Sequence, residues 1–276
     1  MHQLIPDDFV LQSEYATTHV TLEDCLSHRS GLPGHHAQLG AKSVQEATRL
    51  LRHLSFTKEP RTEWQYSNHM YWAVSHMVEV QTGKSLEQFM THRLWRPLEM
   101  NNTFLSLEHA DAHTIGRPHM SLAQSYHWDE KINKLSPLPY WDDIGMSGAG
   151  ALVSTVSDQA KWLRSFINRN GPLSPAGYEA LTSPHMLMPP TSARFQGPHC
   201  YGMGWFIARY HGELVLFHPG GTVGFAANVI LLPELNWGVV GMCNGSSDGI
   251  LDVPMWHLVD EFLEIPFDRR INVFQE

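Results

Sequence analysis

The fold class is decided by residues 201–243, which read YGMGWFIARYHGELVLFHPGGTVGFAANVILLPELNWGVVGMC. β-branched and aromatic side chains gather there in four runs, and such runs favour strands. The runs cover residues 201–210, 214–218, 225–232 and 237–243. His211-Gly212 fits a two-residue turn and the other connections are short, so neighbouring strands should pair. The sequence therefore predicts a four-stranded antiparallel meander.

Upstream of this region, helix-start signals dominate the chain. Four serine or threonine residues are each followed, three positions later, by a carboxyl or amide side chain, as in a capping box. They are Thr21, Ser43, Ser85 and Thr155. A further helix is expected over residues 68–81, stopped by Gly83, and a closing helix over residues 250–263. Residues 105–150 are expected to be irregular, apart from a hairpin near Asp129.

Helices that are followed by a meander and a last helix predict an α+β fold. The chain has 276 residues and no linker rich in proline, glycine or serine, so we expect a single domain over residues 1–276. Its helical and irregular part would cover about residues 20–198, and its sheet part about residues 199–276.

Composition excludes several classes of partner. The net charge is −9, from 28 acidic and 19 basic residues, and this disfavours nucleic acid binding. Three cysteines form no disulfide framework, and the histidines show no metal-ligand spacing, so we expect no metal. The first residues do not resemble a signal peptide and the apolar runs are too short to span a bilayer. We expect no membrane partner and a cytoplasmic chain as given, whereas a longer parent could be secreted; the oligomeric state stays open.

The first candidate site is Tyr66-Ser67-Asn68, at a loop-to-helix junction. A tyrosine in a cleft can act as a general base if a nearby cation lowers its pKa from about 10. An asparagine two residues later can orient that base or donate to a substrate amide. Core packing would explain the tripeptide equally well when it is taken alone.

The second candidate site is His218-Pro219-Gly220-Gly221, at the end of a predicted strand. Gly220 and Gly221 would let a substrate backbone approach the strand edge closely. Backbone N–H groups that are free at such a place can stabilise an oxyanion. A plain hairpin turn also favours proline and glycine.

Six segments taken in order resemble those of the serine β-lactamase-like, or penicillin-binding-protein-like, family. This family includes class C β-lactamases, D-Ala-D-Ala carboxypeptidases, and related esterases and transesterases. The segments are TLEDCLSHRSGLP (21–33), YSN (66–68), RPLEMNNT (96–103), GAGALVST (148–155), YGMGW (201–205) and HPGG (218–221). The resemblance covers nearly the whole chain and implies a β-lactamase/transpeptidase-like fold.

The resemblance also implies a chemistry, namely acyl transfer through a covalent serine ester. By position, Tyr66 would be the general base and Asn68 the group that orients it. His218 would replace the cation or donor of the family's third motif, and the N–H of Gly221 would be one oxyanion donor. The expected substrate is a small ester, lactone or amide, with no metal or organic cofactor. A histidine in place of the lysine common in β-lactamases favours an esterase or transesterase.

The chain departs from the family pattern at the nucleophile. In the family, the nucleophile lies in a Ser-x-x-Lys helix that precedes all six segments, yet only 20 residues precede Thr21 here and none form that motif. We therefore expect a chain shortened at its N-terminus, without the first strands and the nucleophile helix. A Ser-x-x-Lys does occur at Ser55–Lys58, but it follows a predicted helix, and Pro60 blocks a regular helix there.

Three hypotheses follow from this departure. The chain is a shortened form of a serine hydrolase or acyltransferase, and it could be inactive for that reason. Alternatively, it is a pseudoenzyme that binds an acyl or amide ligand without turnover. In the third hypothesis, Ser55 or another serine supplies unusual chemistry.

Overall fold

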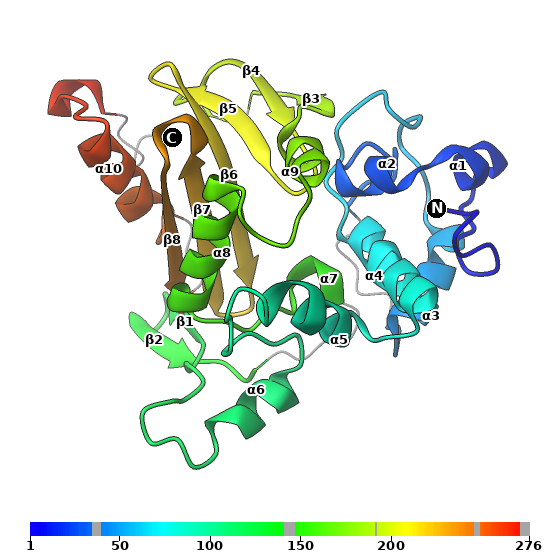
Figure 1. The fold of residues 1–276 in the computed structure, drawn as a ribbon, viewed down its shortest axis with the longest axis horizontal. Coiled ribbons are helices and arrows are strands. Elements are labelled where there is room, and N and C mark those ends of the chain that lie inside the picture. Colours follow the sequence, from blue (N-terminus) through cyan, green and yellow to red (C-terminus); the bar gives the residue numbers. More distant parts are fainter. Residues whose placement is uncertain (35–39, 141–146, 191, 246–248, 271–276) are drawn as a thin grey trace.

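The structure, a computed structural model, describes residues 1–34, 40–140, 147–190, 192–245 and 249–270. Its largest feature is a six-stranded antiparallel sheet whose strand order equals the chain order (Figure 1). The strands are β3 (Met186–Met188), β4 (Gln196–Tyr201), β5 (Phe206–Tyr210), β6 (Glu213–Thr222), β7 (Phe225–Leu232) and β8 (Trp237–Cys243). The predicted α+β meander is therefore present, with two more strands than expected.

The prediction of one strand over residues 201–210 is wrong. β4 ends at Tyr201 and β5 begins at Phe206, because the chain turns sharply between them. Gly204 has a φ of +83°, which favours glycine, and a Cβ on Gly202 would lie 2.4 Å from the carbonyl oxygen of Leu181. The aromatic pattern predicted extended chain correctly but gave no sign of the turn inside it. The sheet also begins earlier than residue 199, at β3.

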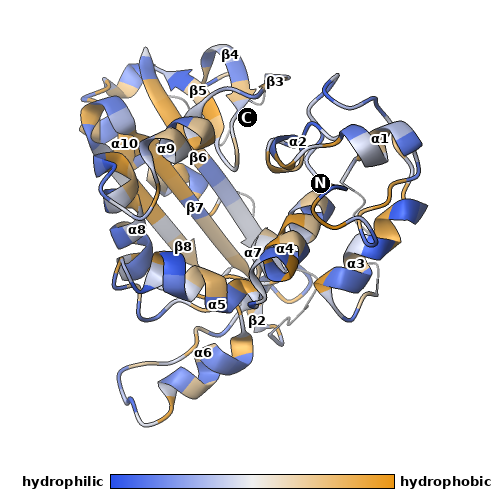
Figure 2. Ribbon diagram, turned by 45° about the vertical axis from the view of Figure 1, so that its right-hand side comes forward, coloured by the Kyte–Doolittle hydropathy of each residue, from blue (hydrophilic) through white to orange (hydrophobic). Residues whose placement is uncertain are grey.

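The two faces of the sheet are covered by different helices. Successive residues of β7 point to opposite faces: Leu231 packs among residues of α8 (Val156–Asn168) and α9 (Pro175–Thr182). Its neighbours Ile230 and Leu232 pack against α10 (Asp252–Phe262). Figure 2 shows β7 as a mostly hydrophobic ribbon in the middle of the sheet, as burial on both faces requires.

The N-terminal part of the chain is helical and has its own core. Its helices are α1 (Glu14–His19), α2 (Leu22–Leu26), α3 (Val44–Leu50) with the 3₁₀ turn η1 (Leu51–His53), and α4 (Asn68–Thr82). Met70, Ala73 and Met77 of α4 pack there against Phe9 and Leu32. Each of the four predicted N-cap side chains accepts from the backbone N–H three residues later, and the complete capping box is recorded at Thr21 and Ser85 but not at Ser43 or Thr155. Gly83 ends α4 with a φ of +66°.

Residues 84–155 connect the two parts. They form α5 (Leu86–Met90), the π-helical turn η2 (Thr91–Trp95), α6 (Leu107–Thr114), the hairpin of β1 (Tyr126–Asp129) and β2 (Lys134–Pro137), and the short helix α7 (Ser147–Gly150). The hairpin near Asp129 is thus confirmed, whereas α6 and α7 correct the prediction of an otherwise irregular segment. In the part of the chain that is described, no helix is long and apolar enough to cross a bilayer.

A charged cluster of Asp24, Arg29 and Arg61 links the helical part to the sheet part through hydrogen bonds. The buried carboxylate of Asp24 accepts hydrogen bonds from Arg29 at 2.6 Å and from Arg61 at 2.8 Å. Arg29 also donates to the carbonyl oxygen of His185, which precedes β3. Burial alone would raise the pKa of Asp24, but hydrogen bonds from Arg61, Thr21 and Arg29 outweigh it and lower the pKa to about 2. The two arginines therefore keep this buried carboxyl group charged.

Candidate active site

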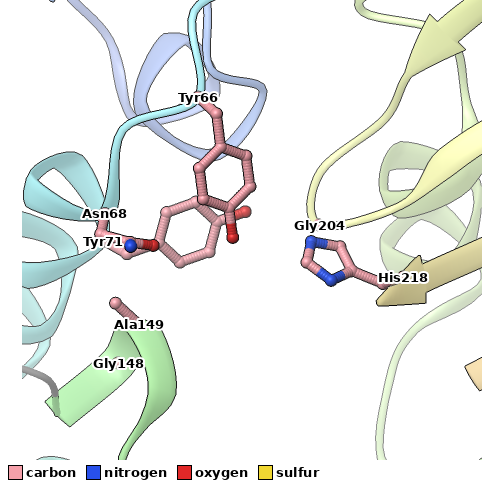
Figure 3. A pocket seen from close by; sticks show the side chains of 7 residues that line it. All are labelled: Tyr66, Asn68, Tyr71, Gly148, Ala149, Gly204 and His218. Atoms are coloured by element: carbon pink, nitrogen blue, oxygen red, sulfur yellow. The ribbon is translucent and has the colours of Figure 1, made fainter. Parts of the chain in front are cut away.

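A pocket of about 200 Å³ lies where the helical part meets the sheet (Figure 3). Three segments that are distant in the sequence line it: the start of α4, the helix α7, and the β4–β5 turn with β6. The lining residues are Tyr66, Asn68, Tyr71, Gly148, Ala149, Gly204 and His218. The pocket thus brings together the three side chains that the sequence singled out, Tyr66, Asn68 and His218.

The start of α4 places Tyr66 and Asn68 on the pocket. Ser67 is the N-cap residue, with extended backbone, and it makes no side-chain cap bond. Its backbone N–H instead donates to Nδ1 of His28 at 3.0 Å. The Tyr66 ring packs on the same histidine, with ring centroids 4.1 Å apart. A residue of the segment 21–33 therefore sets the position of this tripeptide.

The hydroxyl of Tyr66 is protonated at neutral pH in this pocket. Burial raises the pKa of Tyr66 above its ordinary value. All lysines and arginines of the chain belong to the described residues, and none of them lines the pocket. The cation that a tyrosine base requires is therefore not supplied by this lining, and the protonated hydroxyl of Tyr66 is able to donate a hydrogen bond. Its role as general base stays a prediction.

His218 is held as a neutral ring of one tautomer. Burial lowers the pKa of His218, so the ring is uncharged at neutral pH. Nδ1 lies 2.8 Å from the carbonyl oxygen of Pro219, which only accepts, so Nδ1 carries the proton. Nε2 then accepts from the hydroxyl of Tyr201 at 3.1 Å. Since burial also raises the pKa of Tyr201 well above its ordinary value, that hydroxyl keeps its proton. Of the two predicted roles, a cation is therefore disfavoured.

Gly220 and Gly221 lie beside the pocket without lining it. β6 pairs with β5 only as far as Phe217, whereas it pairs with β7 as far as Thr222. Among the described strands, none pairs with β6 beyond His218 on the edge that faces away from β7. An oxyanion donor was expected on this part of β6, and the role of Gly221 stays a prediction.

Tyr71, Gly148, Ala149 and Gly204 also line the pocket and were not predicted as site residues. Tyr71 lies one helical turn after Asn68 and donates its hydroxyl to the carbonyl oxygen of Leu26 at 2.8 Å. The i, i+3 spacing from Asn68 was the signal that could have found it. A Cβ on Gly148 would lie 2.1 Å from Oγ of Ser75 and 3.2 Å from the carbonyl oxygen of Tyr71. Only glycine lets α7 approach α4 so closely and bring Ala149 to the pocket.

The alternative motif at Ser55–Lys58 is not built like a nucleophile. These residues follow η1 and are not helical, so the lysine is not one helical turn from the serine. Nζ of Lys58 pairs with Glu63 at 2.5 Å, on the surface. Neither residue lines the pocket. Among the described residues, moreover, no group of three His, Cys, Asp or Glu side chains could hold a metal ion.

A six-stranded antiparallel sheet between helices, with a Tyr-x-Asn turn facing a His-x-Gly strand across a pocket, defines the β-lactamase/transpeptidase-like class of proteins. The comparisons with known proteins agree with this class. A family model described as Beta-lactamase matches residues 4–263. The chain therefore belongs to the β-lactamase family.

Two fungal relatives match almost the whole chain. The Unguisins hydrolase of Aspergillus campestris is 36% identical over 281 residues, and that of Aspergillus violaceofuscus is 34% identical over 300. Each alignment covers 99% of this chain but 52% of the relative, so the chain spans about half the length of these curated relatives. A solved structure, an octameric penicillin-binding protein homologue from Pyrococcus abyssi, superposes with a TM-score of 0.78 at 23% identity. That superposition covers 89% of this chain and 56% of the other.

Proposed function

We propose that the pocket is the acyl-transfer site of a hydrolase that cleaves an amide or ester. The observation that carries this proposal is the meeting of Tyr66 and Asn68 with His218 on one pocket of a β-lactamase-family fold. The names of the two fungal relatives, which describe hydrolases, support hydrolysis rather than transfer to a second acceptor.

In the proposed reaction, a hydroxyl nucleophile attacks the substrate carbonyl from within the pocket. The proton of this hydroxyl passes to the Tyr66 oxygen, which must first have lost its own proton to solvent beside a cation that the described lining does not supply. The O–C bond forms in the same step, and the tetrahedral oxyanion develops next to β6. The C–N or C–O bond then breaks, and the leaving group takes that proton. Water repeats the sequence on the acyl ester and releases the acid. Asn68 holds the substrate amide with its side-chain amide.

The backbone of β6 supports Gly221 as the oxyanion donor. Amides alternate in direction along an antiparallel strand, so residues 219 and 221 share one orientation. Position 219 is a proline, which has no N–H that could donate to β7. It therefore suits the group of β6 positions whose amides point away from β7. The N–H of Gly221 would then point away from β7, at the edge of β6 beside His218.

Charge in the pocket favours an uncharged acyl group. No lysine or arginine of the chain lines it, and His218 is neutral. A carboxylate next to the scissile bond would lose hydration there without gaining a cation. The proposed substrates are therefore peptide amides, internal or cyclic peptide bonds and esters, rather than acids such as penicillins or peptides with a free C-terminus.

A second function, binding of an acyl or amide ligand without turnover, is favoured by two observations. Among the described residues no serine lines the pocket, and Tyr66 is protonated. Both functions use the same pocket and differ only in whether an acyl–enzyme forms.

One experiment separates them. The chain is incubated with p-nitrophenyl butyrate and with a fluorophosphonate probe, and its intact mass is measured. Hydrolysis predicts release of p-nitrophenol and one adduct on the nucleophilic hydroxyl, both lost in Tyr66→Phe. Binding alone predicts no adduct, with a shift of the Tyr66 resonances when an acyl amide is added. An adduct that only Ser55→Ala removes would contradict both.

A further inference from the structure

We infer that His28 is a positioning residue of the pocket, which holds the Tyr66-Ser67-Asn68 turn through an acceptor nitrogen and an aromatic face. This inference rests on the proposed function only in the sense that the pocket is the one described above. His28 itself is buried and does not line the pocket.

The backbone of His28 is unusual for a buried residue. His28 is 1% exposed, yet its φ is +55°, in the left-handed region that disfavours side chains with a Cβ. Its carbonyl oxygen accepts from the N–H of Gln65 at 2.8 Å, so the backbone of His28 is bonded to the segment that leads into Tyr66. Strained conformations of this kind persist where the surroundings hold them, and they cluster at functional sites.

The side chain of His28 makes one directed hydrogen bond. Nδ1 accepts from the N–H of Ser67 at 3.0 Å, which fixes the proton on Nε2. Burial, with a smaller repulsion from His218, lowers the pKa of His28 to about 3. The ring is therefore neutral at any pH where the protein works, and the acceptor is always available. Nε2 finds no hydrogen-bond partner among the described residues, so the bond of Nδ1 is what orients the ring there.

The same ring lies at the centre of the aromatic cluster behind the pocket. Its centroid is 4.1 Å from that of Tyr66, 5.1 Å from that of Tyr71 and 5.0 Å from that of Tyr201. Tyr201 in turn donates to His218. His28 thus contacts both the tyrosine on the helical side and the tyrosine that fixes the histidine on the sheet side.

Two substitutions separate the acceptor from the ring. In His28→Asn, the amide oxygen occupies the place of Nδ1, and asparagine tolerates a positive φ. In His28→Phe, the ring remains but the acceptor is lost. We would measure hydrogen exchange of the Ser67 amide and, with ¹³C-labelled tyrosine, the pKa of Tyr66. Amide exchange of Ile230 on β7 reports global unfolding as the control.

We expect His28→Phe to accelerate exchange of the Ser67 amide about tenfold or more, while its ring keeps Tyr66 buried and the pKa of Tyr66 raised. Exchange at Ile230 should change less than the Ser67 exchange. His28→Asn should keep Ser67 exchange near wild type, but the loss of the ring should lower the raised pKa of Tyr66 toward 10. Equal behaviour of the two variants, or equal acceleration at Ser67 and Ile230, would overturn the inference. If His28→Phe does not fold, the test rests on His28→Asn alone. Faster exchange of the Ser67 amide in His28→Asn than in the wild type would then overturn the inference. Neither readout requires turnover, so failure of the proposed function would leave this result interpretable.

Discussion

Tyr66 and His218 face each other across the pocket. Burial keeps the hydroxyl of Tyr66 protonated and the ring of His218 neutral. Their ring centroids are 6.2 Å apart, so a small carbonyl group can contact both side chains. With Tyr66 protonated and His218 neutral, the pocket offers donors and no charge. A deprotonated Tyr66 requires a cation next to its hydroxyl, and any group that activates the site must supply one.

The bond from Tyr201 to His218 gives a prediction for one hydroxyl group. Tyr201→Phe removes the donor to Nε2, so the ring of His218 should no longer keep a single tautomer. Since that bond stabilises the neutral ring, the pKa of His218 should rise toward its ordinary value. The side-chain ¹⁵N shifts of His218 against pH measure both effects.

Tyr178→Phe is the matched control. Tyr178 is also fully buried, and its hydroxyl accepts from the N–H of Gly171 away from the pocket. Each variant should lose about 1 kcal/mol of stability, but only Tyr201→Phe should alter His218. The same ¹⁵N spectrum for both variants would refute the assigned bond.

Among single residues, Tyr66, Asn68 and His218 could be predicted from the sequence because their motifs are short and local. Tyr71, Gly148 and Gly204 could not, because they reach the pocket only after α7 and the β4–β5 turn pack against α4. His28 was inside a recognised segment, but nothing in that segment indicates that its ring lies under Tyr66.

At the scale of elements, the contact between α7 and α4 gives a prediction with a matched control. Gly148→Ala would place a Cβ 2.1 Å from Oγ of Ser75 and should cost about 1–3 kcal/mol, while moving Ala149 in the pocket. Gly177→Ala, in α9, meets its nearest atoms at 3.4 Å, an ordinary contact, and should be neutral or stabilising by about 0.5–1 kcal/mol. Urea unfolding of both variants checks this, and equal changes in stability would contradict the close packing.

Caps and strand patterns predicted most elements because both are local properties. The capping box of Thr21 with Asp24 forms as expected, and β7 and β8 have the predicted bounds. α6, α9 and β3 were missed, because short elements of ordinary composition depend on the packing around them. β6 extends to Thr222 through proline and glycine, since β7 pairs with it along that whole length.

For the whole molecule, the cluster around Asp24 predicts how stability depends on pH. The pKa of Asp24 in the folded protein, about 2, lies below the ordinary value of 3.8. Its ionised carboxylate therefore contributes to the free energy of unfolding above about pH 4. That contribution is lost as the pH falls from about 4 through 2, when the carboxylate that binds Arg29 and Arg61 becomes protonated.

Asp24→Asn should therefore cost about 3 kcal/mol at pH 7 and should flatten the loss of stability in acid. Asp111→Asn, an exposed aspartate on α6, is the control and should leave both the stability and its pH profile unchanged. Chemical unfolding from pH 7 to pH 2 measures the profiles. An Asp24→Asn profile parallel to that of the wild type would show that the cluster does not hold the two parts together.

The class of the whole fold could be predicted because six ordered segments carried the family resemblance, and the family model confirms it. That residues 1–276 form a single domain, and that the chain is shortened, stay predictions. The first gains support from a pocket lined by both the helical part and the sheet.

The central claim is that Tyr66, Asn68 and His218 form one site for an uncharged acyl group. The most direct measurement compares the binding of N-acetylphenylalanine amide and of its free acid, in both enantiomers, by NMR titration at pH 8. One enantiomer of the amide should bind at least about tenfold more tightly than the matching acid, because the acid's charge meets no cation. This binding should shift the resonances of Tyr66, Asn68 and His218 together. Equal or tighter binding of the acid, or shifts confined to another surface, would contradict the account.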